Sequence, residues 1–193
     1  MYELLHLYVQ KLCPQCQVNL TLVEPFLRLK KVCKEEFLFP EGDICNFVGL
    51  TNQGCFRTFF LKEGKELTLF FHPEYHSLGD YESWLRQKPA CFSCQAIEDS
   101  EVLIIDTQVI KVLETEPDGQ KLLRLVVEEL AFQLRDRLLS LYRDSPEQRY
   151  LNFLQYEPTL LQRIPQYYLA SHFGIEPESL SRLKRRIHEK RSS

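Results

Sequence analysis

PQYYLASHFGIEPESLSRLKRRI, residues 165–187, predicts two short helices joined by a tight turn. The first helix is expected over Pro165–Phe173 and the second over Pro177–Lys190, with Gly174-Ile175-Glu176 between them. Two helices joined by a short turn that contains glycine are typical of the helix-turn-helix motif, whose second helix enters the major groove of DNA. The stretch therefore predicts an all-α unit able to contact DNA.

The second of these helices has one apolar face and one polar face. Leu180, Leu183 and Ile187 follow helical spacing, so we expect them to pack inward. The other positions carry side chains of the kinds that contact bases and phosphates: Glu178, Ser179, Ser181, Arg182, Lys184, Arg185 and Arg186. The basic run could instead be a solvated helix end whose cations favour the helix dipole. Because it follows a helix-turn-helix pattern, we favour DNA contact.

The net charge hides an asymmetry along the chain. The sequence has 24 Lys and Arg against 27 Asp and Glu, a formal charge of −3. Residues 147–193 carry +3, whereas residues 1–146 carry −6. A mild overall acidity would argue against a nucleic-acid partner, but the basic excess lies in the segment with the helix pair.

The segment before the tail is expected to be mainly β. Short apolar or alternating runs occur at 37–39, 45–50, 55–61, 67–71, 91–97 and 102–105. Turn signals separate them, and six of the seven glycines fall at expected turns: Gly42, Gly54, Gly64, Gly79, Gly119 and Gly174. This spacing favours a small sandwich, roll or barrel. An amphipathic helix is expected before it, over about residues 18–29.

The pattern then changes to helical spacing. A short helix is expected over Thr107–Thr115, and Glu116-Pro117-Asp118 indicates the start of a long one. Six apolar residues form a stripe along it: Leu123, Val127, Leu130, Leu134, Leu138 and Leu141. The stripe can pack on the β segment, or a second copy of the chain can cover it in a coiled-coil-like seam. We expect the seam.

Several stretches resemble the Crp/Fnr family of bacterial transcription regulators. They are residues 165–187, FPEGDICNFVGLTNQGCFRTFFLKEGKELTLFF at 39–71, LGDYESWL at 78–85, AIEDSEVLIID at 96–106 and SPEQRYLNFLQYEPTLLQRIP at 145–165. The resemblance implies an α+β fold: a jelly-roll-like, cyclic-nucleotide-binding-type β-roll over 1–116, a dimerisation helix over 117–145 and a helix-turn-helix domain over 146–193. It also implies a non-enzymatic homodimer that binds double-stranded DNA, with RNA polymerase as a further partner.

The resemblance assigns roles to individual positions. Glu178 would accept from cytosine and Arg182 would donate to guanine, while Ser179, Ser181 and the cations of 184–186 would contact phosphates. Gly79-Asp80 matches the start of the family's cyclic-phosphate cassette, but its arginine position falls at Ala90-Cys91. Without that cation a buried phosphate is poorly compensated. We therefore expect a roll that has lost or changed cyclic AMP recognition, with an unknown effector and no fixed cofactor.

The seven cysteines are expected to be mostly reduced thiols. Cys13/Cys16 and Cys91/Cys94 have the C-x-x-C spacing of a metal site. The second pair lies in an expected strand, so the first is the better metal candidate. An iron-sulfur redox sensor of the same family would use Cys13, Cys16 and Cys33, but their spacing departs from that family's cluster.

A cupin-like metal enzyme is an alternative from another class, with His72, Glu74 and His76 as ligands. The remaining histidines are far away in sequence, and no nucleophile-base pair, P-loop or GxGxxG turn is present. We therefore expect neither catalysis nor a metal. Because no apolar run approaches a membrane span and no signal-peptide pattern is found, we expect a cytoplasmic location and no membrane partner.

Overall fold

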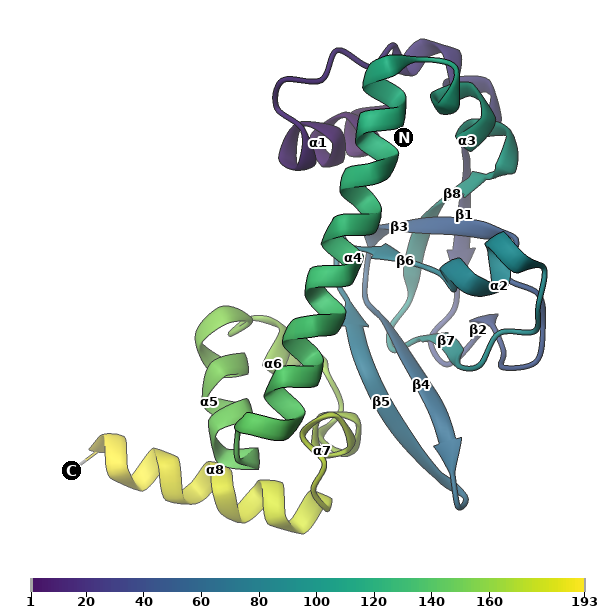
Figure 1. The fold of residues 1–193 in the computed structure, drawn as a ribbon. Coiled ribbons are helices and arrows are strands. Elements are labelled where there is room, and N and C mark those ends of the chain that lie inside the picture. Colours follow the sequence, from purple (N-terminus) through teal and green to yellow (C-terminus); the bar gives the residue numbers. More distant parts are fainter. Residues whose placement is uncertain (1, 193) are drawn as a thin grey trace.

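The computed structural model describes residues 2–192 and has three parts in chain order. Figure 1 shows a β-roll, a long helix that runs past it, and a group of short helices at the far end of that helix. The expected α+β fold, with a roll, a long helix and an all-α tail, is confirmed.

Two four-stranded antiparallel sheets form the roll, with strand orders β1-β8-β3-β6 and β2-β7-β4-β5. The strands are β1 (Arg28–Val32), β2 (Phe37–Phe39), β3 (Phe47–Gln53), β4 (Phe56–Lys62), β5 (Lys65–His72), β6 (Ser77–Leu78), β7 (Ser93–Ala96) and β8 (Ser100–Asp106). Strands far apart in sequence pair, as Gly49 does with Ile104. The space between the sheets is filled by buried side chains that include Phe39, Phe56 and Val102.

The N-terminal segment differs from the sequence prediction. The helix expected over residues 18–29 is wrong: two short 3₁₀ helices, η1 (Leu20–Leu22) and η2 (Glu24–Phe26), lie there, and β1 begins at Arg28. Pro25 removes a helical hydrogen bond, and pairing of β1 with β8 pulls the chain into the sheet. A helix with no sequence prediction, α1 (Tyr2–Leu12), packs beside the long helix.

The long helix α4 (Pro117–Arg143) begins where the sequence predicted and extends about 40 Å at 1.5 Å per residue. It follows the short helix α3 (Thr107–Glu114), whose N-cap is Asp106. Gly119 was expected in a turn but lies in the first turn of α4. A side chain there would come within 2.1 Å of the Leu113 carbonyl oxygen, so glycine allows α3 and α4 to approach.

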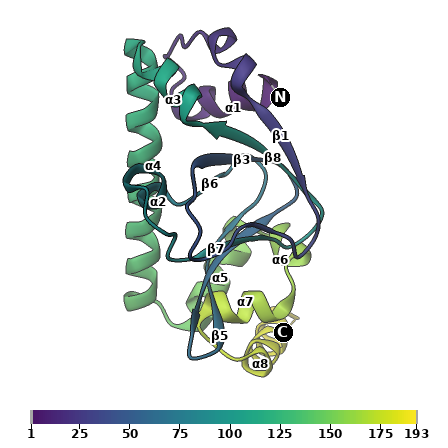
Figure 2. The same ribbon diagram turned by 90° about the vertical axis from the view of Figure 1, so that its right-hand side faces the viewer.

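Four helices form the C-terminal unit, which we call the head: α5 (Pro146–Tyr156), α6 (Leu160–Arg163), α7 (Gln166–Phe173) and α8 (Pro177–Ser192). Its apolar core includes Leu169, Phe173 and Leu180, and it is continuous with Cys55 and Phe71 of the roll. Figure 2 shows the head against the lower end of the roll, beside β5. The head and the roll therefore share one core.

Candidate nucleic-acid interface

The tight turn between α7 and α8 depends on Gly174. Its φ of 72° lies in the left-handed region that favours glycine, and its N–H caps α7 by donating to the carbonyls of Ala170 and Ser171. Leu180, Leu183 and Ile187 of α8 are buried against α7 and α5, as the spacing predicted. The pair has the geometry of a helix-turn-helix unit.

Packing of the apolar face leaves the other side of α8 open to solvent. Glu178, Ser181, Arg182, Arg185 and Arg186 are exposed, and Ser179 and Lys184 are partly buried. Arg182 Nη2 donates to Ser179 Oγ at 3.3 Å, and Ser181 Oγ accepts from Gln166 of α7. The predicted DNA-contacting residues thus lie on one helix, and a shallow depression runs between several of them.

The local surroundings of two of these cations reduce their availability to DNA. Arg186 pairs with Glu147 at the start of α5, a carboxylate that the sequence pattern did not single out. Lys184 is partly buried, and this lowers the pKa of its ammonium group. Arg182 and Arg185 have no acidic partner closer than 4.0 Å among the described residues. The strongest cationic surface of α8 is therefore at 182 and 185.

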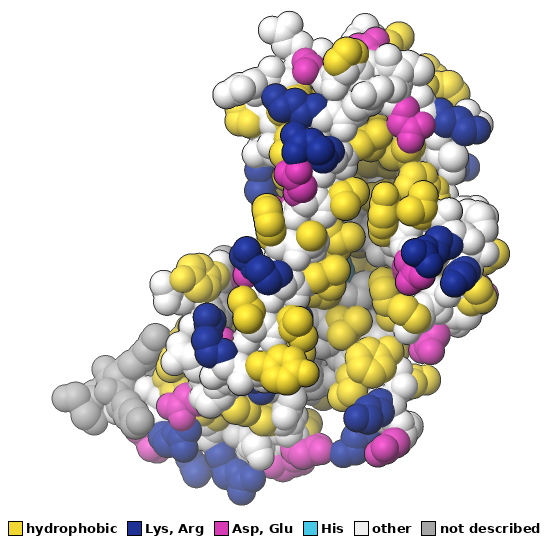
Figure 3. Space-filling view, viewed as in Figure 1, with side chains coloured by type: hydrophobic (Ala, Val, Ile, Leu, Met, Phe, Trp, Pro, Cys, Tyr) yellow, Lys and Arg dark blue, Asp and Glu magenta, His cyan; other side chains and the backbone are white. Residues whose placement is uncertain are grey.

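The apolar stripe of α4 is largely uncovered. Val127, Leu130, Leu134, Leu138 and Leu141 are exposed by 36–55%, and Leu123 is partly buried. Figure 3 shows hydrophobic side chains along this helix and in the groove beside it. Exposed apolar surface of this extent on a helix is typical of a protein interface.

The four residues of the predicted phosphate cassette lie close together. Asp80 is buried; its Oδ1 accepts from Ser83 N at 3.0 Å as the N-cap of α2 (Tyr81–Arg86), and its Oδ2 accepts from Cys91 N at 3.4 Å. Gly79 has a φ of 143°, and Ala90 is buried. The Asp80 carboxylate thus binds backbone N–H groups of its own loop and of Cys91. Positions 90 and 91 carry alanine and cysteine in place of the family's arginine.

A cavity of about 240 Å³ opens between α4 and the roll, bounded also by α1, α2 and α3. Among the described residues that line it, Glu114 is the only charged one, and the others are aliphatic, aromatic or neutral polar. Gly79 of the predicted phosphate cassette also lines this cavity. His72 lies in its wall, where burial lowers the pKa of the imidazole to about 4, so the ring is neutral at pH 7. The walls offer no cation to a phosphate.

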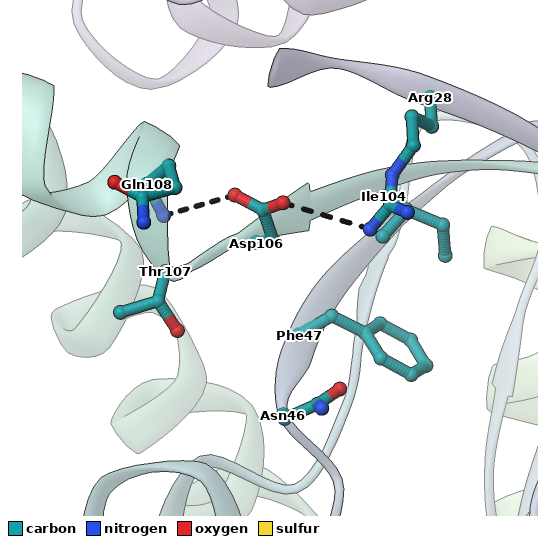
Figure 4. A pocket seen from close by; sticks show the side chains of 7 residues that line it. All are labelled: Arg28, Asn46, Phe47, Ile104, Asp106, Thr107 and Gln108. Carbon is teal, nitrogen blue, oxygen red and sulfur yellow. Dashed lines mark hydrogen bonds and ion pairs between the residues drawn. The ribbon is translucent and has the colours of Figure 1, made fainter.

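A second depression lies at the start of β3, between Arg28, Phe47 and Thr107 (Figure 4). Asp106 occupies its centre, where it pairs with Arg28 at 3.5 Å and accepts from Gln108 N at 2.9 Å. These contacts cap α3 and join it to β1. Since the charged groups of this pocket satisfy each other, we assign them a structural role.

The metal-site alternatives find no geometric support. Cys13 and Cys16 form a disulfide, so the expectation of reduced thiols is wrong for this pair, and their sulfurs are not free for an iron-sulfur cluster. The turn at Pro14 brings the two sulfurs together, a feature that spacing alone does not distinguish from metal binding. Among the described residues, no three His, Cys, Asp or Glu side chains are placed to share a metal ion.

The residues proposed for a cupin-like site have other partners. Both ring nitrogens of His72 lie within hydrogen-bond distance of protein groups, Thr58 Oγ1 at 3.2 Å and the Ser77 carbonyl at 3.0 Å. Glu74 binds Arg163 and the Gly54 N–H. His76 Nδ1 contacts the Glu74 carbonyl oxygen at 3.1 Å. Among the described residues, these three side chains are not placed to share a metal ion.

Comparison with known proteins shows what this geometry is similar to. Residues 29–116 match the cyclic nucleotide-binding domain family. FixK2 from Bradyrhizobium japonicum has a TM-score of 0.72 at 19% identity and 85% coverage of each chain. The catabolite activator protein of Thermus thermophilus has a TM-score of 0.56 at 22% identity, covering 95% of this chain and 87% of its own.

A protein from Eubacterium rectale, described as a Crp/Fnr-family regulator, has a TM-score of 0.62 at 19% identity, covering 88% of this chain and 82% of its own. Residues 29–116 are therefore similar to a cyclic nucleotide-binding domain, and the chain as a whole has the fold of solved Crp/Fnr regulators. A search of curated proteins found no match. Within residues 2–192, no helix is both long and apolar enough to cross a membrane.

Proposed function

We propose that this chain is a sequence-specific, DNA-binding transcription regulator that acts as a homodimer. One observation carries the proposal: α8 packs its apolar face on α7 and presents Glu178, Arg182 and Arg185 to solvent. In a helix-turn-helix unit this is the helix that enters the major groove. Arg182 is a donor for guanine, Glu178 an acceptor for cytosine, and Ser179, Ser181 and the remaining cations are phosphate contacts.

The exposed stripe of α4 supports the dimer. Leu134, Leu138 and Leu141 lie where a second α4 could cover them. A two-fold dimer would present two α8 helices to successive major grooves about 34 Å apart, so the operator should be a pseudo-palindrome. Because residues 1–146 carry −6, binding should depend on the two heads.

The roll is proposed as a sensor or a retained scaffold that does not recognise cyclic AMP. Its cassette lacks the arginine, and the adjacent cavity has no lining Lys or Arg among the described residues. If the roll senses another effector, that effector must bind the two dimer geometries with different affinity.

Selection of bound sites from a random DNA pool tests the proposal. The full chain should enrich a palindrome whose half-sites are separated by about one helical turn. The matched control is Arg182→Ala/Arg185→Ala, which leaves the buried face of α8 intact and should enrich nothing. Adding cyclic AMP should leave the selected sequence and its affinity unchanged. Failure of the unmodified chain to enrich any sequence would reject the proposal.

A further inference from the structure

Arg57 of β4 reaches out of the roll and contacts the head. Its guanidinium carbon lies 3.5 Å from the ring centroid of Tyr168 in α7 and 4.0 Å from that of Phe59 in its own strand. The side chain is only 1% exposed. A desolvated cation between two aromatic rings is the strong form of the cation–π interaction. The roll and the head therefore meet through a buried charge.

The roll alone holds this guanidinium in place. Arg57 Nε and Nη2 donate to Gln95 Oε1 at 3.1 and 2.7 Å, and Nη2 pairs with Glu66 at 2.5 Å. Gln95 is directly opposite Arg57 in β7, so sheet register fixes the contact. The head contributes only the Tyr168 ring. Residues of the roll thus hold the Arg57 guanidinium in the position where Tyr168 of α7 packs on it.

A second contact joins α7 to the free edge of the sheet. The pairing of β4 with β5 shifts at Leu69, because Thr58 is opposite Phe70 while Phe59 is opposite Thr68. Ser171 Oγ of α7 accepts from the Thr68 N–H at 2.9 Å and donates to the Glu66 carbonyl at 2.6 Å. One hydroxyl therefore takes the place of a neighbouring strand at this edge.

The long helix meets the same place. Arg137 Nη2 of α4 donates to the carbonyl of His172 at 2.8 Å and to that of Thr68 at 3.4 Å. It thereby contacts the head and the roll at once. Burial lowers the pKa of Arg137 to about 10, so the guanidinium stays charged at neutral pH. Roll, long helix and head converge on the β4–β5 hairpin.

This interface is incompletely satisfied. Within the described part of the chain, the buried side-chain polar atoms without a hydrogen-bond partner are Arg57 Nη1, Thr68 Oγ1, Arg137 Nε and His172 Nδ1, and all four belong to it. Each such atom opposes burial. These four atoms therefore offset part of the favourable contacts that hold the head on the roll.

We propose that Arg57 is a positioning residue that couples the roll to the orientation of α8. Seating of Tyr168 on the Arg57 guanidinium fixes the orientation of the head, and the four unpartnered atoms lower the free-energy cost of leaving the docked state. In a dimer, a released head no longer holds its α8 at the half-site spacing. The inference goes beyond DNA binding itself, although one of its tests rests on the proposed function.

Hydrogen exchange tests the docking without DNA. The Thr68 amide is bonded to Ser171, so its exchange reports head docking. Arg57→Met should raise its exchange rate about tenfold or more, while the Leu50 and Leu103 amides of β3 and β8 stay protected. The matched control, Arg28→Met, removes an exposed arginine of the other sheet and should change neither. Unchanged Thr68 exchange in a folded Arg57→Met chain would overturn the proposal.

Variants of Tyr168 test the contact from the other side if Arg57→Met fails to fold. Tyr168→Leu removes the ring and should release the head as Arg57→Met does. Tyr168→Phe keeps the ring face and should restore the protection of Thr68. If Tyr168→Phe releases the head as fully as Tyr168→Leu, the cation–π contact is not what seats it, and the proposal fails.

Comparison of two DNAs separates positioning from folding. Arg57→Met should lose about tenfold in affinity for the selected palindrome yet stay within about twofold on a single half-site, because only two-headed binding needs both heads in place. Equal losses on the two DNAs would show that Arg57 merely stabilises the fold. If no palindrome is selected at all, the proposed function fails, whereas the exchange experiments still decide the docking.

Discussion

Arg163 grips the carboxylate of Glu74 with two parallel hydrogen bonds, Nη1 to Oε2 at 2.9 Å and Nη2 to Oε1 at 2.8 Å. Its Nε also donates to Glu98 at 3.1 Å. Arg163 ends α6 in the head, whereas both acids belong to loops of the roll. Burial alone would raise the pKa of Glu74, but hydrogen bonds from Arg163 and Gly54 outweigh it and hold that pKa below its ordinary value.

Arg163→Met should lower the free energy of unfolding by about 1–3 kcal/mol at pH 7, because two partly buried carboxylates lose their partner. The stabilisation from Glu74 is present above its unfolded pKa and is lost as pH falls through its lower folded pKa. Urea denaturation should therefore show the deficit at neutral pH and a smaller one below about pH 4. Arg135→Met breaks an exposed pair and should cost little. A pH-independent deficit would contradict this account.

His172 should make the protein sensitive to mild acid. Burial, aided by Arg137, lowers the pKa of its imidazole to about 3. The unfolded chain binds this proton near pH 6.5 and the folded chain does not, so stability is complete above about pH 6.5 and falls toward pH 3. His72 acts in the same direction. Each of the two histidines should lower the free energy of unfolding by about 1 kcal/mol per pH unit as the pH falls through this range.

His172→Phe removes one of these titrating groups while keeping an aromatic ring beside Phe71 and Phe153. Its urea midpoint should fall less than that of the unmodified chain between about pH 7 and pH 5. An unchanged slope in His172→Phe would show that this ring is not responsible.

Substitution of two neighbouring leucines of α4 tests which face of the helix forms the dimer seam. Leu138 continues the stripe, whereas Leu139 is turned away from it by about 100°. Their exposures are similar, 55% and 47%. Leu138→Glu should give a monomer in sedimentation experiments, and Leu139→Glu should remain a dimer. Two monomeric variants, or two dimeric ones, would place the seam elsewhere.

Single changes in α8 and at its ion-pair partner in α5 should separate base contact from phosphate contact. Arg182→Ala should cost about 1–3 kcal/mol on the selected operator and relax specificity at one base pair. Glu147→Gln releases Arg186 from its partner, so it should strengthen binding to all DNA and steepen the salt dependence by up to about one charge. Titrations at several salt concentrations check both. An equal effect of Arg182→Ala on random DNA would make Arg182 a phosphate contact.

Thiol counting checks the Cys13–Cys16 bond. Alkylation of the denatured chain should modify five cysteines without reductant and seven after reduction. In the folded chain Cys33 and Cys91 are exposed and should react first. Cys45, Cys55 and Cys94 should react slowly, because they are buried and burial raises the pKa of each thiol. Seven modified cysteines without reductant would disprove the disulfide.

Local sequence signals predicted the tail and most strands of the roll. Gly174 and the spacing of Leu180, Leu183 and Ile187 specify the helix pair through contacts only a few residues apart. The strands β2, β4 and β5 were bounded by turns whose glycines have positive φ. The same spacing leaves five of the seven predicted DNA-contacting residues of α8 exposed, whereas Ser179 and Lys184 are partly buried.

Features that depend on distant partners were not predictable from the sequence. β1 forms because it pairs with β8, as Leu29 does with Leu103, although the sequence predicted the end of a helix at residues 28–29. Arg57 looked like an ordinary strand residue; its burial requires Gln95 and Tyr168 from elsewhere in the chain. Cys13 and Cys16 offered a spacing shared by metal sites and disulfides. Long-range geometry decided the first two cases, whereas Cys13 and Cys16 are only three residues apart and the local turn decided the third.

The hydroxyl of Ser171 at the edge of β5 has a consequence for exchanging parts between such proteins. Cutting the chain at residue 146 would remove Ser171, the hydrogen-bond partner of the β5 edge. It would also expose Cys55, Phe71 and Ile97, which belong to the core shared with the head. The transplantable unit is therefore the helix pair together with the β4–β5 hairpin on which it sits. A chimera with a foreign roll should be soluble only if that hairpin travels with its own head.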